Sequence, residues 1–257
     1  MSTRPPANLR EINIHIGTWL SIGSPVIAEL AAESGFEWLL FDLEHGSGSE
    51  HALLGQLQAI RGSHAAAIVR IGAPHADLIG RVLDWGADGF MVPHVSSVAE
   101  AEACAQAAHY PPRGRRGVSR SVRAYGYGLR PPGSPETIAP PVIMAQIETS
   151  EGVNNARAIA MVDGIDVLFV GPADLQFDLH ARPEHALRDY HACLAEVAAA
   201  AAAGGKQCGI LVRNPAEVDA LRTLGFTMLA IDSDMAILRQ GFQRILQDVN
   251  DVTLSLH

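Results

Sequence analysis

The sequence predicts a single-domain (β/α)8 barrel that spans residues 1–257. Eight short apolar runs alternate with eight segments of helical pattern, the order expected of a parallel sheet covered by helices. The apolar runs are continuous rather than alternating, which indicates strands that are buried on both faces. The chain of 257 residues also has the size of such a barrel, about 250 residues. A doubly wound open sheet is the alternative, but the count of eight strands favours closure.

The first half of the chain alternates regularly after a short N-terminal segment. Residues 1–12 are expected to form a tail with one helical turn at residues 8–12. Apolar runs predict strands at residues 14–20, 38–43, 66–71 and 89–93. Helical patterns predict helices at residues 25–34, 50–61, 77–85 and 98–108. Each strand is therefore followed by one helix.

The second half repeats this order after a long loop. Residues 111–141 are rich in Gly, Pro and Arg, and a loop of that length in a compact domain is usually functional. Strands are predicted at residues 143–148, 165–170, 206–211 and 227–231. Helices are predicted at residues 153–161, 184–203, 215–224 and 234–246. No Gly-rich phosphate-binding motif follows the first strand, so we expect no dinucleotide site.

Composition and charge exclude several classes of protein. A net charge of −9 argues against a nucleic-acid-binding surface, and no apolar run approaches the roughly 20 residues of a membrane span. One local exception is a cluster of arginines at residues 113–123, which could face an anionic small molecule or a partner subunit. Residues 1–10 lack the apolar stretch of a signal peptide. The three cysteines, Cys104, Cys193 and Cys208, match no metal-binding spacing, so we expect buried free thiols in a cytoplasmic protein.

Two acidic residues follow successive strands of the second half. Residues 143–152, IMAQIETSEG, carry Glu148 at the end of an apolar run and then a hydroxyl residue that can cap a helix. Residues 165–170 form the next apolar run, and Asp174 lies just beyond its end. Both acids could be ordinary helix caps. If the strands are parallel neighbours, however, the two carboxylates converge, and hard divalent cations prefer such oxygen ligands.

Other strand ends carry residues that suit the same site, because the active site of a (β/α)8 barrel lies at the C-terminal ends of its strands. His45 is a candidate general acid/base, Arg70 a fixed cation and Gln146 a polar contact, although each could instead be a structural residue. Asp84, near a helix end, is either a surface acid or the carboxylate that orients His45. Lys206 lies at a strand start and no lysine lies at a strand end, which disfavours a Schiff-base enzyme.

This grouping suggests a reaction. A divalent ion on Glu148 and Asp174 would leave positions for a 2-oxo acid, which could chelate it through its carboxylate and keto oxygens. The ion would act as a Lewis acid on the keto group, and Arg70 would stabilise the enolate oxygen. His45 would move the proton of the aldol hydroxyl group.

With these residues in view, the chain resembles the metal-dependent class II pyruvate aldolases of the 4-hydroxy-2-oxoheptanedioate and 2-dehydro-3-deoxyglucarate type. Their superfamily also holds the citrate lyase β subunit. The resemblance runs from about Gly17 to Gly241. The matching motifs are GTW at 17–19, FDLEHG at 41–46, VR at 69–70, GADG at 86–89, VP at 92–93, YPPRG at 110–114, RGV at 116–118, QIET at 146–149 and GPADL at 171–175.

The resemblance implies a role for each catalytic candidate. Glu148 and Asp174 would be the ligands of a divalent cation, either Mg²⁺, Mn²⁺ or Co²⁺. Arg70 would contact the keto oxygen, and His45 with Asp84 would form the acid/base dyad. Whether that dyad forms within one subunit or across an interface is open.

The resemblance also implies the residues that bind substrate. They surround the pyruvyl group or shape the aldehyde pocket: Trp19, Val118, Gln146, Gly171, Pro172, Ala173 and Leu211. The backbone near Ala173 would receive the pyruvyl carboxylate, which suits a helix N-terminus.

The implied activity is reversible cleavage of 4-hydroxy-2-oxo acids to an aldehyde and pyruvate, or a related 2-oxo acid such as hydroxypyruvate, through a metal-bound enolate. An oxaloacetate decarboxylase or an acyl-CoA lyase on the same scaffold, and a non-catalytic oxo-acid-binding barrel, are the alternatives. Sugar acids or aromatic breakdown products would be the source of substrate. Family members are typically homohexamers, trimers of dimers, in which the last helix is exchanged onto a neighbouring barrel.

The chain departs from the family pattern at two places near the predicted site. Ser119 follows the RGV motif where many members have Gly, although the sugar-acid branch also tends to Ser. After the last strand, residues 231–235 read IDSDM, with two acids where the family usually has Gly and one Asp. These departures bear on substrate identity and on subunit contacts.

Overall fold

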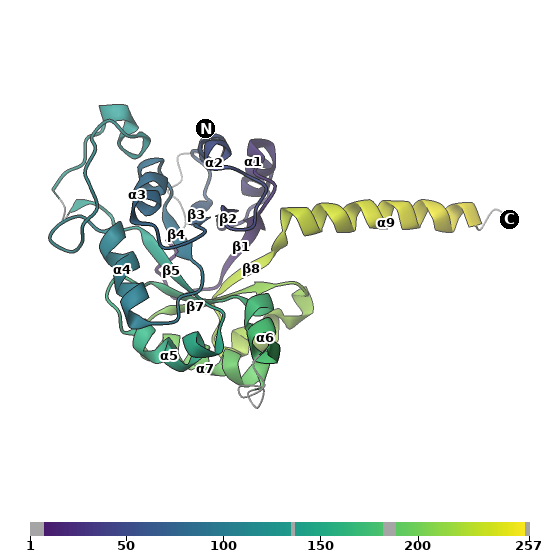
Figure 1. Ribbon diagram of the computed structural model, residues 1–257. Helices are drawn as coiled ribbons and strands as arrows, with labels where there is room; N and C mark the ends of the chain where they lie inside the picture. Colours follow the sequence, from purple (N-terminus) through teal and green to yellow (C-terminus); the bar gives the residue numbers. More distant parts are fainter. Residues whose placement is uncertain (1–7, 135–136, 182–188, 255–257) are drawn as a thin grey trace.

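The computed structural model of the protein describes residues 8–134, 137–181 and 189–254. Eight parallel strands pair in chain order, and β8 pairs with β1, so the sheet closes into a barrel (Figure 1). The predicted (β/α)8 fold is confirmed. The strands are β1 (His15–Leu20), β2 (Trp38–Asp42), β3 (Ala66–Arg70), β4 (Gly89–Val92), β5 (Val142–Ile147), β6 (Val167–Val170), β7 (Gln207–Val212) and β8 (Met228–Ser233).

Helices follow the strands and cover the outside of the barrel (Figure 1). Hydroxyl side chains begin several of them: Ser24, Ser49 and Thr149 each accept a hydrogen bond from a backbone N–H of the first turn. The α-helices are α1 (Pro25–Glu33), α2 (Glu50–Ala59), α3 (Ala76–Asp84), α4 (Val98–Ala108), α5 (Ser150–Ala160), α6 (Pro172–Ala181), α7 (Tyr190–Ala203), α8 (Val218–Leu224) and α9 (Asp234–Leu254). Two 3₁₀ helices are η1 (Arg123–Gly128) and η3 (Pro215–Glu217).

Five elements differ from the sequence-based expectation. Residues 8–12 form a turn instead of a helix. The helix α6 was not predicted, because Gly-Pro at its start reads as a loop, although Pro suits the first helical position. The loop at 111–141 contains η1, and α9 continues to Leu254. The predicted helix at 184–203 begins at Tyr190 in the described part, since residues 184–188 lie outside it.

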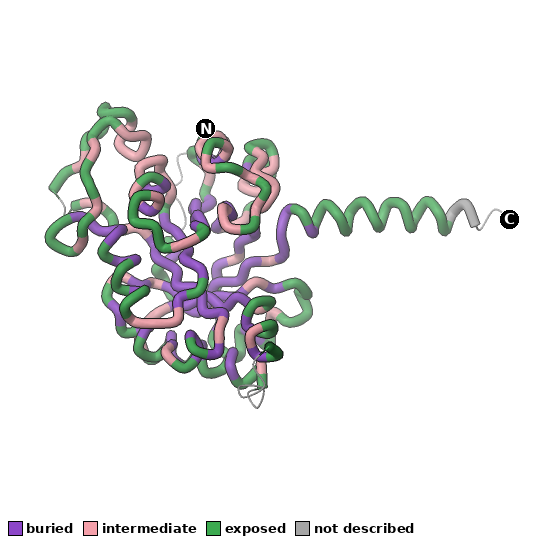
Figure 2. Tube along the Cα trace, in the orientation of Figure 1, coloured by how far each residue is buried: buried purple, intermediate pink, exposed green. Residues whose placement is uncertain are grey.

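Two layers of core hold the barrel together (Figure 2). One layer lies between the sheet and the helices, and it includes the three cysteines, which are buried and free as predicted. The other fills the inside of the barrel and includes Trp38 and Phe169, whose rings meet edge to face. Within the described residues, no helix is long and apolar enough to cross a membrane.

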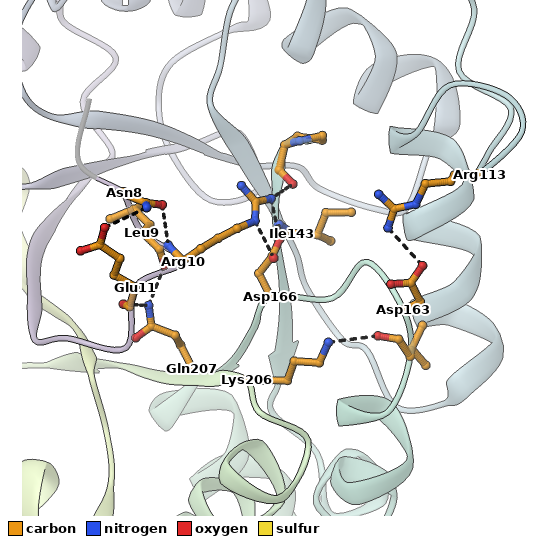
Figure 3. Close-up of polar contacts among 12 residues, drawn as sticks. Asn8, Leu9, Arg10, Glu11, Arg113, Ile143, Asp163, Asp166, Lys206 and Gln207 are labelled. Carbon is orange, nitrogen blue, oxygen red and sulfur yellow. Dashed lines mark hydrogen bonds and ion pairs between the residues drawn. The ribbon is translucent and has the colours of Figure 1, made fainter. Parts of the chain in front are cut away.

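The N-terminal segment closes one end of the barrel. Leu9 is 2% exposed and packs in the inner core. Arg10 forms a two-point ion pair with Asp166, at 2.9 Å and 3.1 Å, and the Gln207 amide donates to the backbone carbonyls of Leu9 and Glu11 (Figure 3). Asp166 and Gln207 lie at the starts of β6 and β7, so this is the N-terminal face, where a barrel is stabilised rather than where it reacts.

The burial of Leu9 at the N-terminal face of the barrel yields a stability prediction. Leu9→Ala should lower the free energy of unfolding by about 2–4 kcal/mol, because it opens a cavity in a closed apolar core. Ile12→Ala, on the same segment but at a side chain that is 68% exposed, is the matched control. Chemical denaturation of both variants measures the difference. Equal effects of the two substitutions would show that Leu9 does not seal the barrel.

Candidate active site

A cavity of about 420 Å³ opens at the C-terminal ends of the strands. Side chains and loops from β1, β2, β3, β5, β6, β7 and β8 line it. The residues predicted from sequence that line this cavity are Trp19, His45, Arg70, Gln146, Gly171, Pro172, Ala173, Asp174 and Leu211. The strand ends therefore do bring most of the candidate residues together.

Glu148, directly after β5, is 2% exposed. Its Oε1 accepts a hydrogen bond of 2.7 Å from the backbone N–H of His94 and lies 3.0 Å from His94 Nδ1. Burial raises the pKa of the Glu148 carboxyl to about 7, against the lowering effect of His94. The negative charges of Asp174 and Glu44 add to that rise in pKa. The carboxylate is thus held in place but not fully neutralised.

The backbone at the end of β6 passes close to Glu148. A Cβ atom at Gly171 would collide with Glu148 Oε2 and with the Gln146 amide, so glycine is required where β6 passes β5. Gln146 is 2% exposed, and its Oε1 has no hydrogen-bond partner within the described residues. Asp174 lies on the first turn of α6, beside the same cavity. Gln146 and Asp174 therefore line the cavity, and the buried Glu148 carboxyl lies next to Gly171, another residue of its lining.

These donors fit a hard divalent cation. A buried carboxylate with a raised pKa, a second carboxylate and an unpaired amide oxygen are groups that a cation would stabilise. Residues 8–134, 137–181 and 189–254 contain no cluster of three or more His, Cys, Asp or Glu side chains arranged to hold a metal ion. The protein would therefore supply two carboxylates, and water or substrate would supply the remaining ligands.

Arg70, at the end of β3, is fixed by two carboxylates. Its Nε and Nη2 donate to the two oxygens of Asp42 at 2.9 Å and 2.8 Å, and its Nη1 lies 2.7 Å from Glu44 Oε2. The Trp19 indole N–H also donates to Asp42, and its ring lies 4.8 Å from the guanidinium carbon. Burial acts to raise the pKa of Asp42, but the hydrogen bond and charge of Arg70 outweigh it and lower the pKa. The Asp42 carboxyl is therefore held in its charged form.

Two histidines lie close to Glu44, and one of them, His45, lines the cavity. The His45 side chain is 69% exposed, with Nε2 3.9 Å from Glu44 Oε1. His94 was not predicted; its backbone has φ = 55°, and its Nε2 lies 3.7 Å from the same Glu44 oxygen. The position of His94 directly after Pro93, at the end of β4, is the sequence signal that could have identified it as a site residue. Asp42 and Glu44 were also missed, although they belong to the same motif as His45.

Asp84 and Val118 do not join this cavity within one chain. Asp84 Oδ1 accepts a hydrogen bond of 2.7 Å from Arg116 Nη2, and the Val118 side chain is 63% exposed. Both line a second hollow between α3 and residues 115–119. The predicted contact between Asp84 and His45 is therefore absent from the described single chain.

Comparison with known proteins decides the family. Residues 15–240 match the HpcH/HpaI aldolase/citrate lyase family. The chain belongs to this family. The 5-keto-4-deoxy-D-glucarate aldolase of Salmonella arizonae is 37% identical over 234 residues, which cover 90% of this chain and 91% of that protein. The protein is therefore a carbon–carbon lyase of the aldolase type, as the sequence predicted.

Solved structures agree with this family. An HpcH/HpaI aldolase/citrate lyase family protein from Burkholderia cenocepacia J2315 has a TM-score of 0.87 at 32% identity, covering 94% of this chain and 97% of that one. An HpcH/HpaI aldolase from Desulfitobacterium hafniense DCB-2 has a TM-score of 0.85 at 27% identity, covering 94% of each chain.

The raised pKa of Glu148 predicts how the stability of the metal-free aldolase depends on pH. Between the ordinary pKa of 4.5 and about 7, the folded state binds more protons at Glu148 than the unfolded state does. This group therefore makes stability fall as the pH rises through that range. Glu148→Gln removes the charge, so it should stabilise the protein at pH 8 by about 1–3 kcal/mol and have little effect at pH 5.

Thermal unfolding in EDTA at pH 5 and pH 8 measures this effect. Glu151→Gln, an exposed acid on the first turn of α5, is the control and should change neither midpoint. A midpoint for Glu148→Gln that shifts equally at both pH values would contradict a buried, titrating carboxylate.

Proposed function

We propose that this aldolase uses a divalent cation to cleave 4-hydroxy-2-oxo acids into pyruvate and an aldehyde. The observation that carries the proposal is the buried Glu148 carboxyl, whose pKa is raised to about 7. It lies next to Gly171, which lines the cavity together with Asp174 and the fixed Arg70. The names of the Salmonella relatives support a sugar diacid as substrate, and such a molecule has a carboxylate at each end.

Glu148 and Asp174 would hold the cation, which could be Mg²⁺, Mn²⁺ or Co²⁺. When bound, it would supply a Lewis acid that polarises the keto group of the substrate. The pyruvyl carboxylate would lie at the start of α6, near Gly171, Pro172 and Ala173, where backbone N–H groups and the helix dipole favour an anion.

Arg70 would stabilise the oxygen on which negative charge develops. An arginine has five N–H groups. Two of them donate to Asp42 and Nη1 forms an ion pair with Glu44, so donors remain for substrate. Because these carboxylates fix the guanidinium before substrate arrives, no reorganisation is needed during the reaction. Gln146 would contact the same end of the substrate, and Trp19 and Leu211 would shape the aldehyde pocket. Val118 would join them only from a neighbouring subunit, because within one chain it lies outside this cavity.

His45 would act as the general base. It would accept the proton of the 4-hydroxyl group, the C3–C4 bond would break to release the aldehyde, and its electron pair would form the enolate of pyruvate. Protonation at C3 then completes the reaction. Asp84 would orient His45 only if it came from a neighbouring subunit, because within one chain it pairs with Arg116.

A homohexamer built as a trimer of dimers is part of this proposal. The helix α9 extends away from the barrel (Figure 1) and is exposed along most of its length (Figure 2). One side of it carries apolar residues at helical spacing, each 37–65% exposed: Met235, Leu238, Phe242, Ile245, Leu246 and Val249. An exposed apolar stripe of this kind is typical of a protein–protein interface. A second copy of this chain in the cytoplasm would bury it by exchanging α9.

Metal removal tests the mechanism. Incubation with EDTA should abolish both pyruvate release from a 4-hydroxy-2-oxo acid and exchange of the pyruvate methyl protons in D₂O, and added Mn²⁺ or Mg²⁺ should restore both. Glu148→Ala should stay more than about 1,000-fold slower with metal present, because the ion would supply several kcal/mol of transition-state stabilisation. Glu151→Ala is the matched control. Wild-type activity that survives exhaustive chelation would refute the metal mechanism.

The assembly is tested on α9 itself. The double variant Phe242→Asp and Leu246→Asp should dissociate the oligomer, because it buries two charges in the proposed interface. The control is Arg244→Asp, which introduces the same side chain on the opposite side of the helix. Light scattering after size-exclusion chromatography measures the mass. A monomeric wild type, or an unchanged mass in the double variant, would contradict helix exchange.

A further inference from the structure

Arg213 lies at the mouth of the cavity, directly after β7, and the mechanism above does not use it. In a closed barrel of eight strands, β7 lies across from β3, which carries Arg70. The Arg213 side chain is 61% exposed, so its charge faces water rather than the core. The other ionisable side chains that line the cavity are Asp42, His45, Arg70 and Asp174. They come from β2, β3 and α6, so Arg213 is the charged group on the wall formed by β7, β8 and β1.

Asp232 holds Arg213 in this place. Its Oδ1 lies 3.0 Å from Arg213 Nη1 and also accepts from the backbone N–H of Ser233, and its Oδ2 accepts from the Gln240 amide of α9. Asp232 is 7% exposed, so the three contacts fix a buried carboxylate. The position of this carboxylate therefore sets the position of the guanidinium.

The backbone of Asp232 is unusual. Its φ is +52°, in the left-handed region that residues with a Cβ atom rarely adopt and that favours glycine. An aspartate at such a position costs stability that a glycine would not cost. Asp and Asn are the residues other than glycine that most readily adopt this conformation, and here the Asp232 side chain engages the backbone N–H of Ser233, Arg213 and Gln240 of α9. This points to a functional reason for holding the arginine.

The chemistry around Arg213 suits an anion. Among the described residues, the hydrogen bond to Asp232 is the only one that the Arg213 side chain makes, which leaves most of its five N–H groups for a ligand. Ser21 and Ser233, next to β1 and at the end of β8, line the same cavity and add neutral hydrogen-bonding groups, as does Gln176 of α6. The Asp234 carboxylate is close in sequence, but it accepts from the backbone N–H groups of Ser21 and Ile22. A guanidinium fork with neutral neighbours recognises a carboxylate.

We propose that Arg213, positioned by Asp232, binds a carboxylate on the aldehyde half of the substrate and makes the enzyme select anionic aldehydes. This inference rests on the proposed aldolase function. The pyruvyl half would lie at Glu148, Asp174 and Arg70, so the aldehyde half extends toward the remaining wall, where Arg213 lies. Arg213 is then a specificity residue, and Asp232 acts through it as a positioning residue.

The test compares two aldehydes of equal carbon number in the addition reaction with pyruvate: succinic semialdehyde, which is anionic, and butanal, which is neutral. The wild type should prefer the anionic aldehyde in kcat/KM. Arg213→Gln should lower the ratio of the two kcat/KM values by about 10- to 100-fold, chiefly through KM for the anionic aldehyde, as expected for one charge-assisted hydrogen-bonded pair. Arg213→Lys should recover part of the ratio, and Asp232→Asn should lower it less than Arg213→Gln does.

Arg222→Gln is the matched control, because Arg222 pairs with Asp219 on the surface of α8, and this variant should keep the wild-type ratio. An equal loss with both aldehydes in Arg213→Gln, or a wild type without preference for the anionic aldehyde, would overturn the inference. Exchange of pyruvate methyl protons in D₂O distinguishes a failure of the Arg213 inference from a failure of the proposed aldolase chemistry. Wild-type exchange with an unchanged ratio removes only the role of Arg213, whereas absence of exchange removes the proposed chemistry itself.

Discussion

The site depends on one buried carboxylate that the protein alone does not neutralise. Glu148 directly follows β5 at the mouth of the barrel. Gly171 lies next to the Glu148 carboxylate and has no side chain that could contact it. Water is excluded, so the charged form is disfavoured and the pKa rises to about 7. A protein that only needed stability would place an amide or an apolar group here. The arrangement is sensible if a positive charge from outside the chain completes it.

Arg70 shows the opposite solution in the same cavity. Its charge is matched within the chain by Asp42 and Glu44, and the Trp19 indole N–H supports Asp42 as well. This cation therefore needs no ligand to be stable and cannot move away from its place. The cavity thus offers a fixed positive group, and next to it lies a carboxyl group whose contacts with His94 do not offset its burial. A substrate that carries a developing negative charge next to a cation fits between them.

The strands and most of the site residues can be predicted from the sequence for a physical reason. Buried parallel strands must be apolar, so their ends are visible as the first polar residues, and in a closed barrel those ends meet. The partners of Arg70 were not predicted, because the pairing of Asp42 with Arg70 depends on the register of β2 against β3. The burial of Leu9 in the inner core was also not predicted, since a lone leucine in a polar segment has no periodic pattern. The position of Asp84 beside Arg116 likewise depends on the fold of the loop at 111–141.

The last helix connects assembly to the mouth of the cavity. The helix α9 starts where β8 ends, and Asp234, at its first position, accepts hydrogen bonds from the backbone of Ser21 and Ile22 after β1. Two turns later, Gln240 donates to Asp232, the residue that holds Arg213. The direction in which α9 leaves the barrel is therefore coupled to the shape of the wall formed by β7, β8 and β1. If a neighbouring barrel fixes α9 by covering its apolar stripe, the same contact fixes Asp232 and Arg213. Subunit exchange would then order the end of the cavity that receives the aldehyde, while the residues proposed to hold the cation, at the ends of β5 and β6, come from one chain.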